Sequence, residues 1–251
     1  MTACSLPLDK LCSIIKQHPD GLLAIEKVPG VLTHPNPKEN KSRSLLKCPF
    51  DYEKECYVWG KENRQDCKLF LVHRIDSATS GVLLASTCPQ LADQLKKAFE
   101  ERLVEKTYYA VVNYHGVSIR SPWKDCLKKT LVCGKTRVIS SKSGMNAITL
   151  AKIKQKTHNQ YGNLALLKLM PQTGRTHQLR VQCAKRRLPI LGDRTYGQFN
   201  LNRKITKLSK TNRLFLHSAK IKVKLSLGGQ SNVTWEAESS LPKEFREILG
   251  Q

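Results

Sequence analysis

Short apolar runs rich in β-branched and aromatic residues recur along this chain, and turn-forming residues separate them. Runs of this kind predict β-strands joined by turns. The predicted strands are residues 22–25, 31–35, 69–72, 82–85, 107–112, 148–153, 164–170, 214–216, 221–225 and 233–237. In the run at 221–225 lysines alternate with apolar residues, so one face is expected to be buried and the other basic. We therefore expect a mixed α+β fold with many antiparallel strands.

Residues 69–85 combine two of these runs around a polar stretch. His73, Arg74 and Asp76 follow the first run, and Gly81 precedes the second. The pattern predicts a strand, an exposed turn and a second strand, with a base, a cation and a carboxylate on a loop between rigid elements. The alternative is an ordinary turn, because Asp, Ser and Thr side chains bond their own backbone there. The remaining sequence has to decide between these interpretations.

The chain carries a large excess of positive charge. Its 251 residues include 43 Lys and Arg against 20 Asp and Glu, which gives a formal charge of +23. A protein this basic most often meets a polyanion, usually nucleic acid; the alternatives are a solvated basic surface or adhesion to a membrane. The sequence has no apolar run of about 18 residues and no signal pattern at its start. We therefore expect a cytoplasmic protein without a membrane span.

Nine cysteines are dispersed along the chain without a CxxC pair. An odd number of cysteines without a secretion signal favours reduced thiols. Cys48, Cys56 and Cys67 are separated by eight and eleven residues, which does not match the short ligand spacings of zinc sites. The sequence therefore predicts no metal site.

Helical periodicity predicts four helices, at residues 7–17, 88–104, 176–188 and 242–249. In the second, Leu91, Leu95 and Leu103 fall on one face. Thr87 is expected to cap this helix, and Pro89 suits its first turn. Three polar or basic segments are expected to be irregular. We expect a long loop at residues 36–68, hairpins and loops at 115–145, and a mobile basic loop at 198–213.

Two further segments are dense in functional side chains, residues 106–110 (KTYYA) and 172–180 (QTGRTHQLR). Arg175 and Arg180 lie five residues apart, so on one helix they would diverge by roughly 140°. One could face a pocket while the other faces a phosphate, or both could coat a basic surface. His73 and His177 could be general bases, although such histidines are more often structural.

Asp76 is the best candidate nucleophile or base. A carboxylate on a fixed loop can form covalent intermediates. When it is buried it needs a cationic partner to stay ionised, and the planar fork of Arg suits that role. A nearby Tyr could stack on a base, because RNA recognition favours aromatic platforms.

Several ordered motifs resemble those of the RluA-type pseudouridine synthases. Residues 73–84 (HRIDSATSGVLL) resemble the family signature HRLDxxTSGxLL, with Ile75 in place of Leu. The other matches are KxYxA at 106–110, TGRTHQ[IL]RV at 173–181, PILGDxxYG at 189–197, RLxLHA at 213–218 and, with Val28 in place of Pro, KPxGxxxHP from residue 27. The matches extend from about residue 20 to 240, and so many motifs in order are highly specific.

This resemblance implies an enzyme that isomerises uridine to pseudouridine in structured RNA, without a cofactor or required metal. By motif, Asp76 is the catalytic aspartate, Tyr108 stacks on the target base, and Arg180 pairs with the aspartate. Arg74 fills the gap left by the flipped nucleotide. His73, Lys106, Arg175 and His177 lie in the same motifs, and we expect them to contact RNA.

The family fold is a curved, mostly antiparallel sheet in two subdomains, with flanking helices and a central cleft. We expect residues 1–251 to form one catalytic domain, with 1–19 as an N-terminal extension. The motif at residue 27 leaves no room for the S4 RNA-binding module that many relatives carry. The basic segments 115–142 and 198–213 are then the expected RNA-binding surfaces.

Two other classes of protein remain as alternatives. A non-catalytic RNA-binding protein that kept the fold would be expected to lack Asp76, Tyr108 or Arg180, and all three are present. A basic membrane-surface protein would need an amphipathic basic helix with bulky aromatic residues, which the sequence does not predict. We expect a monomer whose partner is ribosomal or transfer RNA.

Overall fold

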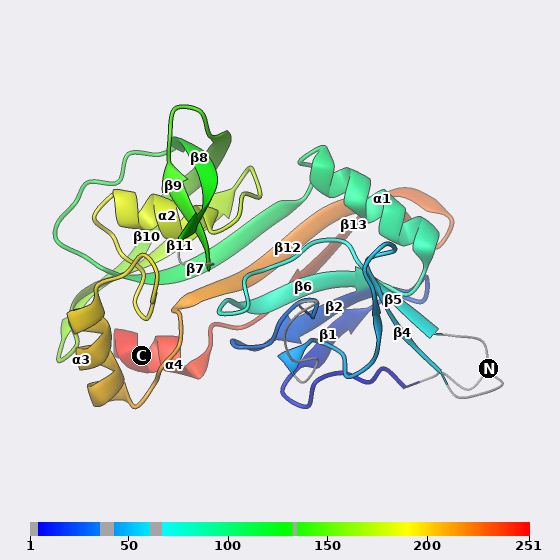
Figure 1. The fold of residues 1–251 in the computed structure, drawn as a ribbon, viewed down its shortest axis with the longest axis horizontal. Coiled ribbons are helices and arrows are strands. Elements are labelled where there is room, and N and C mark those ends of the chain that lie inside the picture. Colours follow the sequence, from blue (N-terminus) through cyan, green and yellow to red (C-terminus); the bar gives the residue numbers. More distant parts are fainter. Residues whose placement is uncertain (1–4, 36–42, 61–66, 133–134) are drawn as a thin grey trace. The chain divides into compact units, whose positions relative to one another are not determined.

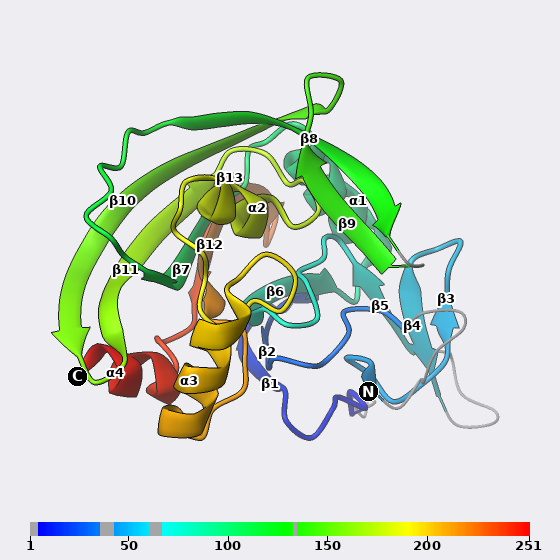
Figure 2. The ribbon, with the colours of Figure 1, turned by 60° about the vertical axis from the view of Figure 1, so that its left-hand side comes forward.

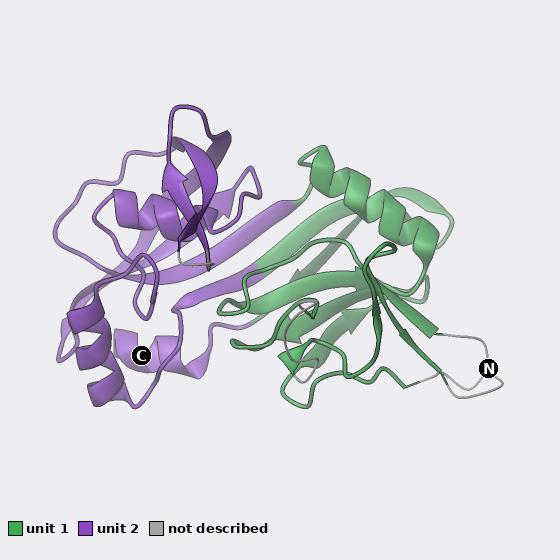
Figure 3. Ribbon diagram, in the orientation of Figure 1, with its two compact units in different colours: residues 1–104, 220–239 green, residues 105–219, 240–251 purple. Residues whose placement is uncertain are grey.

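The computed structural model describes residues 5–35, 43–60, 67–132 and 135–251. The strand pairs named in this section are all antiparallel. The described residues form two compact units, which Figure 3 colours separately. Unit 1 comprises residues 1–104 and 220–239, and unit 2 comprises residues 105–219 and 240–251. The described residues form both strands and helices, which confirms the expected α+β class.

The strands of unit 1 come mainly from the N-terminal part of the chain (Figure 1). They are β1 (Ser13–Gln17), β2 (Leu22–Lys27), β3 (Phe50–Asp51), β4 (Cys56–Trp59), β5 (Cys67–Leu71), β6 (Ser80–Ser86), the residues of β12 (Leu216–Leu227) from 220 onward, and β13 (Gln230–Glu238). β2 pairs with β1 and β6, while β5 pairs with β6 and β4, and β4 pairs with β3. β12 pairs with β13.

Strand β2 is buried on both faces, which explains its continuous apolar sequence. Leu22 and Ala24 point into one hydrophobic cluster, and Leu23 and Ile25 point into another. The same alternation occurs in β6, which pairs with β2. Because side chains of a strand alternate between faces, two cores enclose these strands. The loop between β5 and β6 is therefore anchored in a well-packed scaffold.

The predicted helix is present as α1 (Pro89–Glu100), and it packs against β5 and β6 through buried residues that include Leu91 and Leu95. Leu103 lies beyond the end of the helix and is exposed. The predicted cap was wrong: the N-cap is Cys88, which makes no side-chain cap hydrogen bond. The Thr87 hydroxyl instead donates to the Gly21 carbonyl.

The N-terminal predictions were less accurate. Residues 13–17 form β1 instead of part of a helix, because hydrogen bonding to β2 outweighs the weak helical spacing. Residues 31–35 contain only an isolated bridge at Leu32, not a strand. The segment expected to be an irregular loop holds β3 and β4, and its residues 36–42 and 61–66 lie outside the described part.

Unit 2 is built on a run of strands in the order β7-β11-β10-β8-β9. Their bounds are β7 (Glu105–Asn113), β8 (Trp123–Val132), β9 (Lys135–Ser140), β10 (Met145–Asn159) and β11 (Gly162–Pro171). The long hairpin of β10 and β11 is strongly curved (Figure 2). The helices are α2 (Gln178–Lys185), α3 (Phe199–Ser209) and α4 (Lys243–Leu249). The predicted hairpins and the helices near 176–188 and 242–249 are confirmed.

The expected basic loop at 198–213 is instead mostly helix α3. The segment contains no Gly or Pro, and several of its residues are good helix formers. Ile205 is the buried residue of this helix. The strand predicted at 221–225 lies within the longer strand β12. Of the strand predicted at 214–216, only Leu216 belongs to β12, and residues 214–215 precede it.

The remaining chemistry of the described residues is simple. None of their helices is long and apolar enough to cross a membrane. Their cysteines are free thiols, namely Cys12, Cys48, Cys56, Cys67, Cys88, Cys126 and Cys183. Within the same residues, no three His, Cys, Asp or Glu side chains gather as metal ligands would.

Candidate active site

Asp76 begins a tight turn between β5 and β6. Its carbonyl accepts a hydrogen bond of 2.9 Å from the amide of Thr79, and β6 starts one residue later at Ser80. The Asp76 side chain is half-buried, whereas Ile75 just before it is buried in a hydrophobic cluster. The carboxylate therefore sits on a short turn whose two ends are fixed, and the two predicted interpretations of this segment are compatible.

The peptide that follows Asp76 is held from the N-terminal part of unit 1. Lys27 is 0% exposed, and its Nζ donates to the carbonyls of Val28 (3.0 Å), Val31 (2.8 Å) and Ser77 (3.0 Å). The Gly30 amide donates to the same Ser77 carbonyl at 2.7 Å. A buried ammonium group is tolerated only when acceptors surround it. Lys27 thus positions the Asp76 turn, a role that the sequence did not reveal.

His73 and Arg74 occupy different environments. The His73 Nε2 accepts a 2.9 Å hydrogen bond from the Leu84 amide, and its ring stacks on Phe99 with centroids 4.5 Å apart. These contacts fix the His73 ring against β6 and α1. Arg74 is exposed and borders a pocket of about 300 Å³ that also contains Tyr52. RNA contacts of both residues remain predictions.

In unit 2, Arg180 forms a buried two-pronged ion pair with Asp193. The Arg180 Nε and Nη2 donate to the two Asp193 carboxylate oxygens at 2.7 and 2.9 Å. Arg180 is 8% exposed and Asp193 is 2% exposed. The amides of Thr195 and Tyr196 also donate to this carboxylate. A fork-to-fork pair of this kind fixes the plane of the guanidinium as well as its position.

His177 stands immediately before α2 in a left-handed conformation, with φ of 52°. Its Nδ1 lies 2.9 Å from the Tyr196 hydroxyl, which also accepts a 2.8 Å hydrogen bond from the Val138 amide. Tyr196 also lies under the guanidinium of Arg180, with 5.1 Å from Cζ to the ring centroid. A left-handed histidine persists only where its surroundings hold it, and Tyr196 provides much of that support.

Arg175 precedes α2 instead of lying on it, so the expected 140° divergence from Arg180 does not apply. The Arg175 amide donates to Oε1 of Gln178 at 3.0 Å, and its Nε donates to the Asn146 carbonyl at 3.2 Å. Its side chain is half-buried. The structure thus places Arg175 in the turn that leads into α2, next to β10.

A chain of buried hydrogen bonds fixes α2 against β10 and β8. Its central links join Thr149 to Gln178 (2.9 Å) and to Gln182 (2.6 Å). Gln182 then donates to Asp125 at 3.0 Å, and Lys185 and Arg186 pair with the same carboxylate. A fully paired polar network specifies one arrangement of a helix. Arg180 therefore projects from a rigid α2.

Lys106 and Tyr108 lie on β7, as predicted, and both side chains are half-buried. Tyr108 is paired in register with Leu169 of β11, which fixes its position along the strand. Burial lowers the pKa of Lys106 from its ordinary value. The structure thus places Tyr108 and Lys106 on one strand that is paired with β11.

Two buried carboxyl groups of unit 2 make its stability sensitive to acid. Burial alone would raise the pKa of Asp125 and Asp193, but their basic partners and other hydrogen bonds hold both pKa values below the ordinary 3.8. The stability that these two carboxylates contribute to the folded state is therefore present above the unfolded pKa. It is lost as the pH falls through the lowered folded pKa. We expect the free energy of unfolding in urea to fall below about pH 4. The fall should be shallower in Asp193→Asn, and an equal fall would contradict this explanation.

The turn of Asp76, strand β7 and helix α2 lie in a region that has a recognised family pattern. The sequence model described as RNA pseudouridylate synthase matches residues 21–185, more than half of the chain. The chain belongs to the RNA pseudouridylate synthase family. The match includes Asp76, Tyr108 and Arg180, and the predicted family resemblance is confirmed. Members of this family are isomerases that convert uridine in RNA to pseudouridine.

Relatives in the family carry two kinds of name. Ribosomal large subunit pseudouridine synthase C of Rickettsia conorii is 34% identical over 232 residues, which cover 92% of this chain and 68% of the relative. tRNA pseudouridine synthase C of Haemophilus ducreyi is 31% identical over 212 residues, covering 79% and 80%. The ribosomal enzyme of Buchnera aphidicola is 39% identical over 156 residues. Those residues are 61% of this chain and 48% of that relative, so the match spans about half of the relative's length.

Solved structures of human pseudouridylate synthase domains share the fold. RNA Pseudouridylate Synthase Domain Containing 1 has a TM-score of 0.68 at 21% identity, over 99% of this chain and 89% of its own. Domain Containing 4 has a TM-score of 0.62 at 22% identity, over 95% and 92%. The expected pseudouridine synthase fold is thus confirmed.

Sequence reasoning missed three residues that support the family's motif residues. Lys27 holds the turn that follows Asp76, Asp193 pairs with Arg180, and Tyr196 supports His177. All three lie in segments that resembled family motifs, which was the available signal. Motif spacing cannot show which buried partner each one contacts, because those partners are distant in sequence.

Proposed function

We propose that this chain isomerises specific uridines of structured RNA to pseudouridine, with Asp76 as the catalytic carboxylate. Family membership supports the reaction class. The observation that carries the assignment of Asp76 is its turn, because buried Lys27 and the Gly30 amide both bind the Ser77 carbonyl. Catalysis requires a reacting group held within a fraction of an ångström of its working position, and the hydrogen bonds to this turn favour such positioning.

The proposed chemistry rearranges one nucleotide without a cofactor. The target base leaves the helical stack, because its C1′–N1 bond is not accessible inside it. Asp76 promotes cleavage of that bond, the uracil turns, and C5 bonds to C1′. The proton lost from C5 is balanced by one gained at N1, so the product is an isomer of the substrate.

Other motif residues have supporting roles in this proposal. Tyr108 stacks on the target uracil and helps to remove the C5 proton, and Arg180 stabilises the ionised carboxylate of Asp76. A guanidinium group has five N–H donors, and Asp193 accepts two from Arg180, so this pairing is compatible with a second carboxylate. Arg74 fills the space that the flipped nucleotide leaves.

The proposed RNA contacts follow the charge of the chain. His73, Lys106, Arg175 and His177 contact the RNA around the target nucleotide, and the formal charge of +23 supports binding to a polyanion. The names of the relatives favour ribosomal or transfer RNA as the substrate. We further propose that the protein acts as a monomer in the cytoplasm.

The experiment that tests this function is a map of pseudouridines in total RNA from cells with and without the gene. Specific ribosomal or transfer RNA positions should lose pseudouridine without the gene and regain it when the gene is restored. Identical maps would refute the proposal. Changed RNA binding with no altered position would favour a non-catalytic RNA-binding protein.

A further inference from the structure

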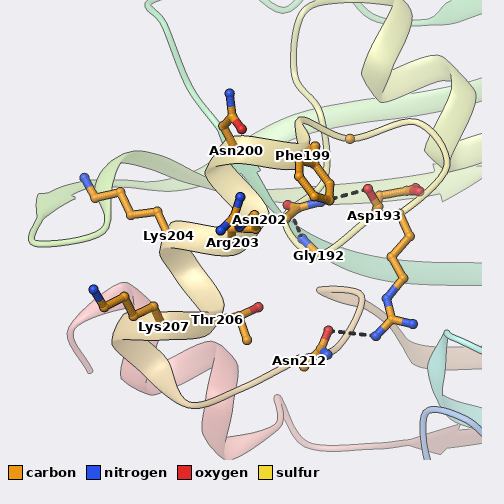
Figure 4. Close-up of a pocket in the computed structure, with 12 residues that line it drawn as sticks. Gly192, Asp193, Phe199, Asn200, Asn202, Arg203, Lys204, Thr206, Lys207 and Asn212 are labelled. Atoms are coloured by element: carbon orange, nitrogen blue, oxygen red, sulfur yellow. Dashed lines mark hydrogen bonds between the residues drawn. The ribbon is translucent and has the colours of Figure 1, made fainter.

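A pocket of about 790 Å³ lies beside helix α3, within unit 2. Its walls are the loop of residues 192–197, one side of α3, and Asn212 just after the helix (Figure 4). This volume lies within the range of ligand pockets, about 300–1,000 Å³. Of the residues that take part in or support the proposed reaction, Asp193, the partner of Arg180, is the one that lines it.

Asn202 fastens α3 to the opposite wall of the pocket. The Gly192 amide donates to Oδ1 of Asn202 at 2.9 Å, and Nδ2 of Asn202 donates to the Asp193 carbonyl at 2.9 Å. Gly192 has φ of +73°, and a Cβ there would meet the Arg213 carbonyl oxygen at 1.7 Å, so this loop passes unusually close to the chain beyond α3. The pocket is therefore bounded by a fixed backbone.

The surface of α3 and its flanking loops is strongly basic. Residues 194–213 include no Asp or Glu, and their exposed basic side chains are Arg194, Arg203, Lys204, Lys207 and Lys210. Lys204 and Lys207 are exposed and extend toward the same side of the helix (Figure 4). Arg194 reaches across to Asn212, with 3.0 Å between Nη2 and Oδ1. Phosphate groups are the natural partners of such a row of cations.

Phe199 opens the helix with an aromatic ring that is largely in solvent. The residue is 73% exposed, and the guanidinium of Arg203 lies 5.7 Å from the ring centroid. Exposed aromatic rings beside cations are the stacking platforms of proteins that bind single-stranded nucleic acids. An unpaired base can stack on this ring while its phosphates approach the cations that follow along the helix.

We propose that α3 and its pocket bind an unpaired segment of the substrate RNA away from the target uridine. One base stacks on Phe199, and neighbouring phosphates contact Lys204 and Lys207. Asn200 and Asn212 in the pocket supply amide groups for the 2′-hydroxyls that distinguish RNA from DNA. This site rests on the proposed function, because it serves to hold the RNA that the enzyme modifies.

An anionic membrane is the main competing occupant, because basic helices with an exposed aromatic residue also bind membranes. Membrane binding requires an apolar face that can enter the lipid, whereas Ile205 of α3 is buried. The exposed large apolar residues of α3 are Phe199 and Leu208. The adjoining surface is a hollow lined by Asn and Thr side chains, which suits a nucleotide better than a bilayer.

The test measures RNA binding by the full-length chain carrying Asp76→Asn, so that turnover does not interfere. The probe is a fluorescein-labelled RNA hairpin with a uridine-containing loop and a single-stranded tail, followed by fluorescence anisotropy at several salt concentrations. Phe199→Ala should weaken binding roughly 10-fold, and Phe199→Tyr should restore it. Lys204→Ala and Lys207→Ala should each reduce the slope of log K against log salt by about 0.7.

Leu208→Ala is the matched control, because it removes an exposed apolar side chain from the same helix. It should bind the RNA as the parent does, and circular dichroism should show that every variant is folded. Unchanged RNA binding by Phe199→Ala would overturn the proposal. So would a finding that Phe199→Ala weakens binding to polyglutamate or to anionic phosphatidylglycerol vesicles by the same factor as binding to RNA. These readouts need no catalysis, so a failure of the proposed isomerisation would appear separately, as absence of product with the wild-type chain.

Discussion

Replacing Asp76 with Asn should abolish pseudouridine formation while RNA binding stays close to that of the wild-type chain. Asn keeps the size of the side chain but removes the charge that the proposed reaction uses. Backbone hydrogen bonds and Lys27 hold the turn, and the substitution leaves the polar groups involved in place. We expect a loss of turnover on the order of 10³-fold or more, measured by nucleoside mass spectrometry under single-turnover conditions.

Asp93→Asn is the matched control for this variant. Asp93 is exposed on α1 of the same unit, so its replacement removes the same charge without touching the turn. It should leave both product formation and RNA affinity unchanged. If Asp76→Asn kept its turnover, the assignment of Asp76 would be wrong; if it lost affinity and turnover equally, Asp76 would have to be a binding residue.

Asp193→Asn should destabilise the protein and reduce turnover. The side chains of Arg180 and Asp193 are 9% and 1% exposed, and removal of one partner from a buried pair leaves an uncompensated charge. Such losses cost about 3–5 kcal/mol, which urea unfolding can measure. Because Asp193 also fixes the plane of the Arg180 guanidinium, kcat should fall further than the folded fraction accounts for.

Asp125→Asn separates these two effects. Asp125 is as deeply buried as Asp193 in its side chain and also pairs with basic groups of α2, namely Lys185 and Arg186. It should therefore lose a similar amount of stability but, at a temperature where both variants are folded, retain more turnover. Equal losses of kcat in the two variants would mean that Asp193 acts only through stability.

The sequence predicted β2, β6 and α1 because the apolar pattern of each segment matches the burial that it has in the fold. β2 and β6 read as continuous apolar runs since both of their faces are buried, and α1 has an apolar face of the right period. The same reasoning failed where tertiary contacts decide. Residues 13–17 become a strand through pairing with β2, and α3 forms in a segment whose single buried residue, Ile205, gave a weak periodic signal.

The candidate site shows the same division. Motifs indicated Asp76, Tyr108 and Arg180, because chemistry restricts the residue types that such positions accept. They did not reveal Lys27 or Asp193 as partners, since these contacts join residues 50 and 13 positions apart. Such contacts depend on how buried polar groups are satisfied, and spacing within one motif carries no information about that.

We expect this chain alone to convert uridine in RNA to pseudouridine. The most direct measurement incubates the purified wild-type chain with transcribed ribosomal or transfer RNA labelled with tritium at uracil C5, in the presence of EDTA. Bonding of C5 to C1′ expels the label, so tritium should appear in the solvent in step with pseudouridine detected by mass spectrometry. Tritium release without pseudouridine, or neither signal from RNA whose sites depend on the gene, would show that this chain alone does not catalyse the isomerisation.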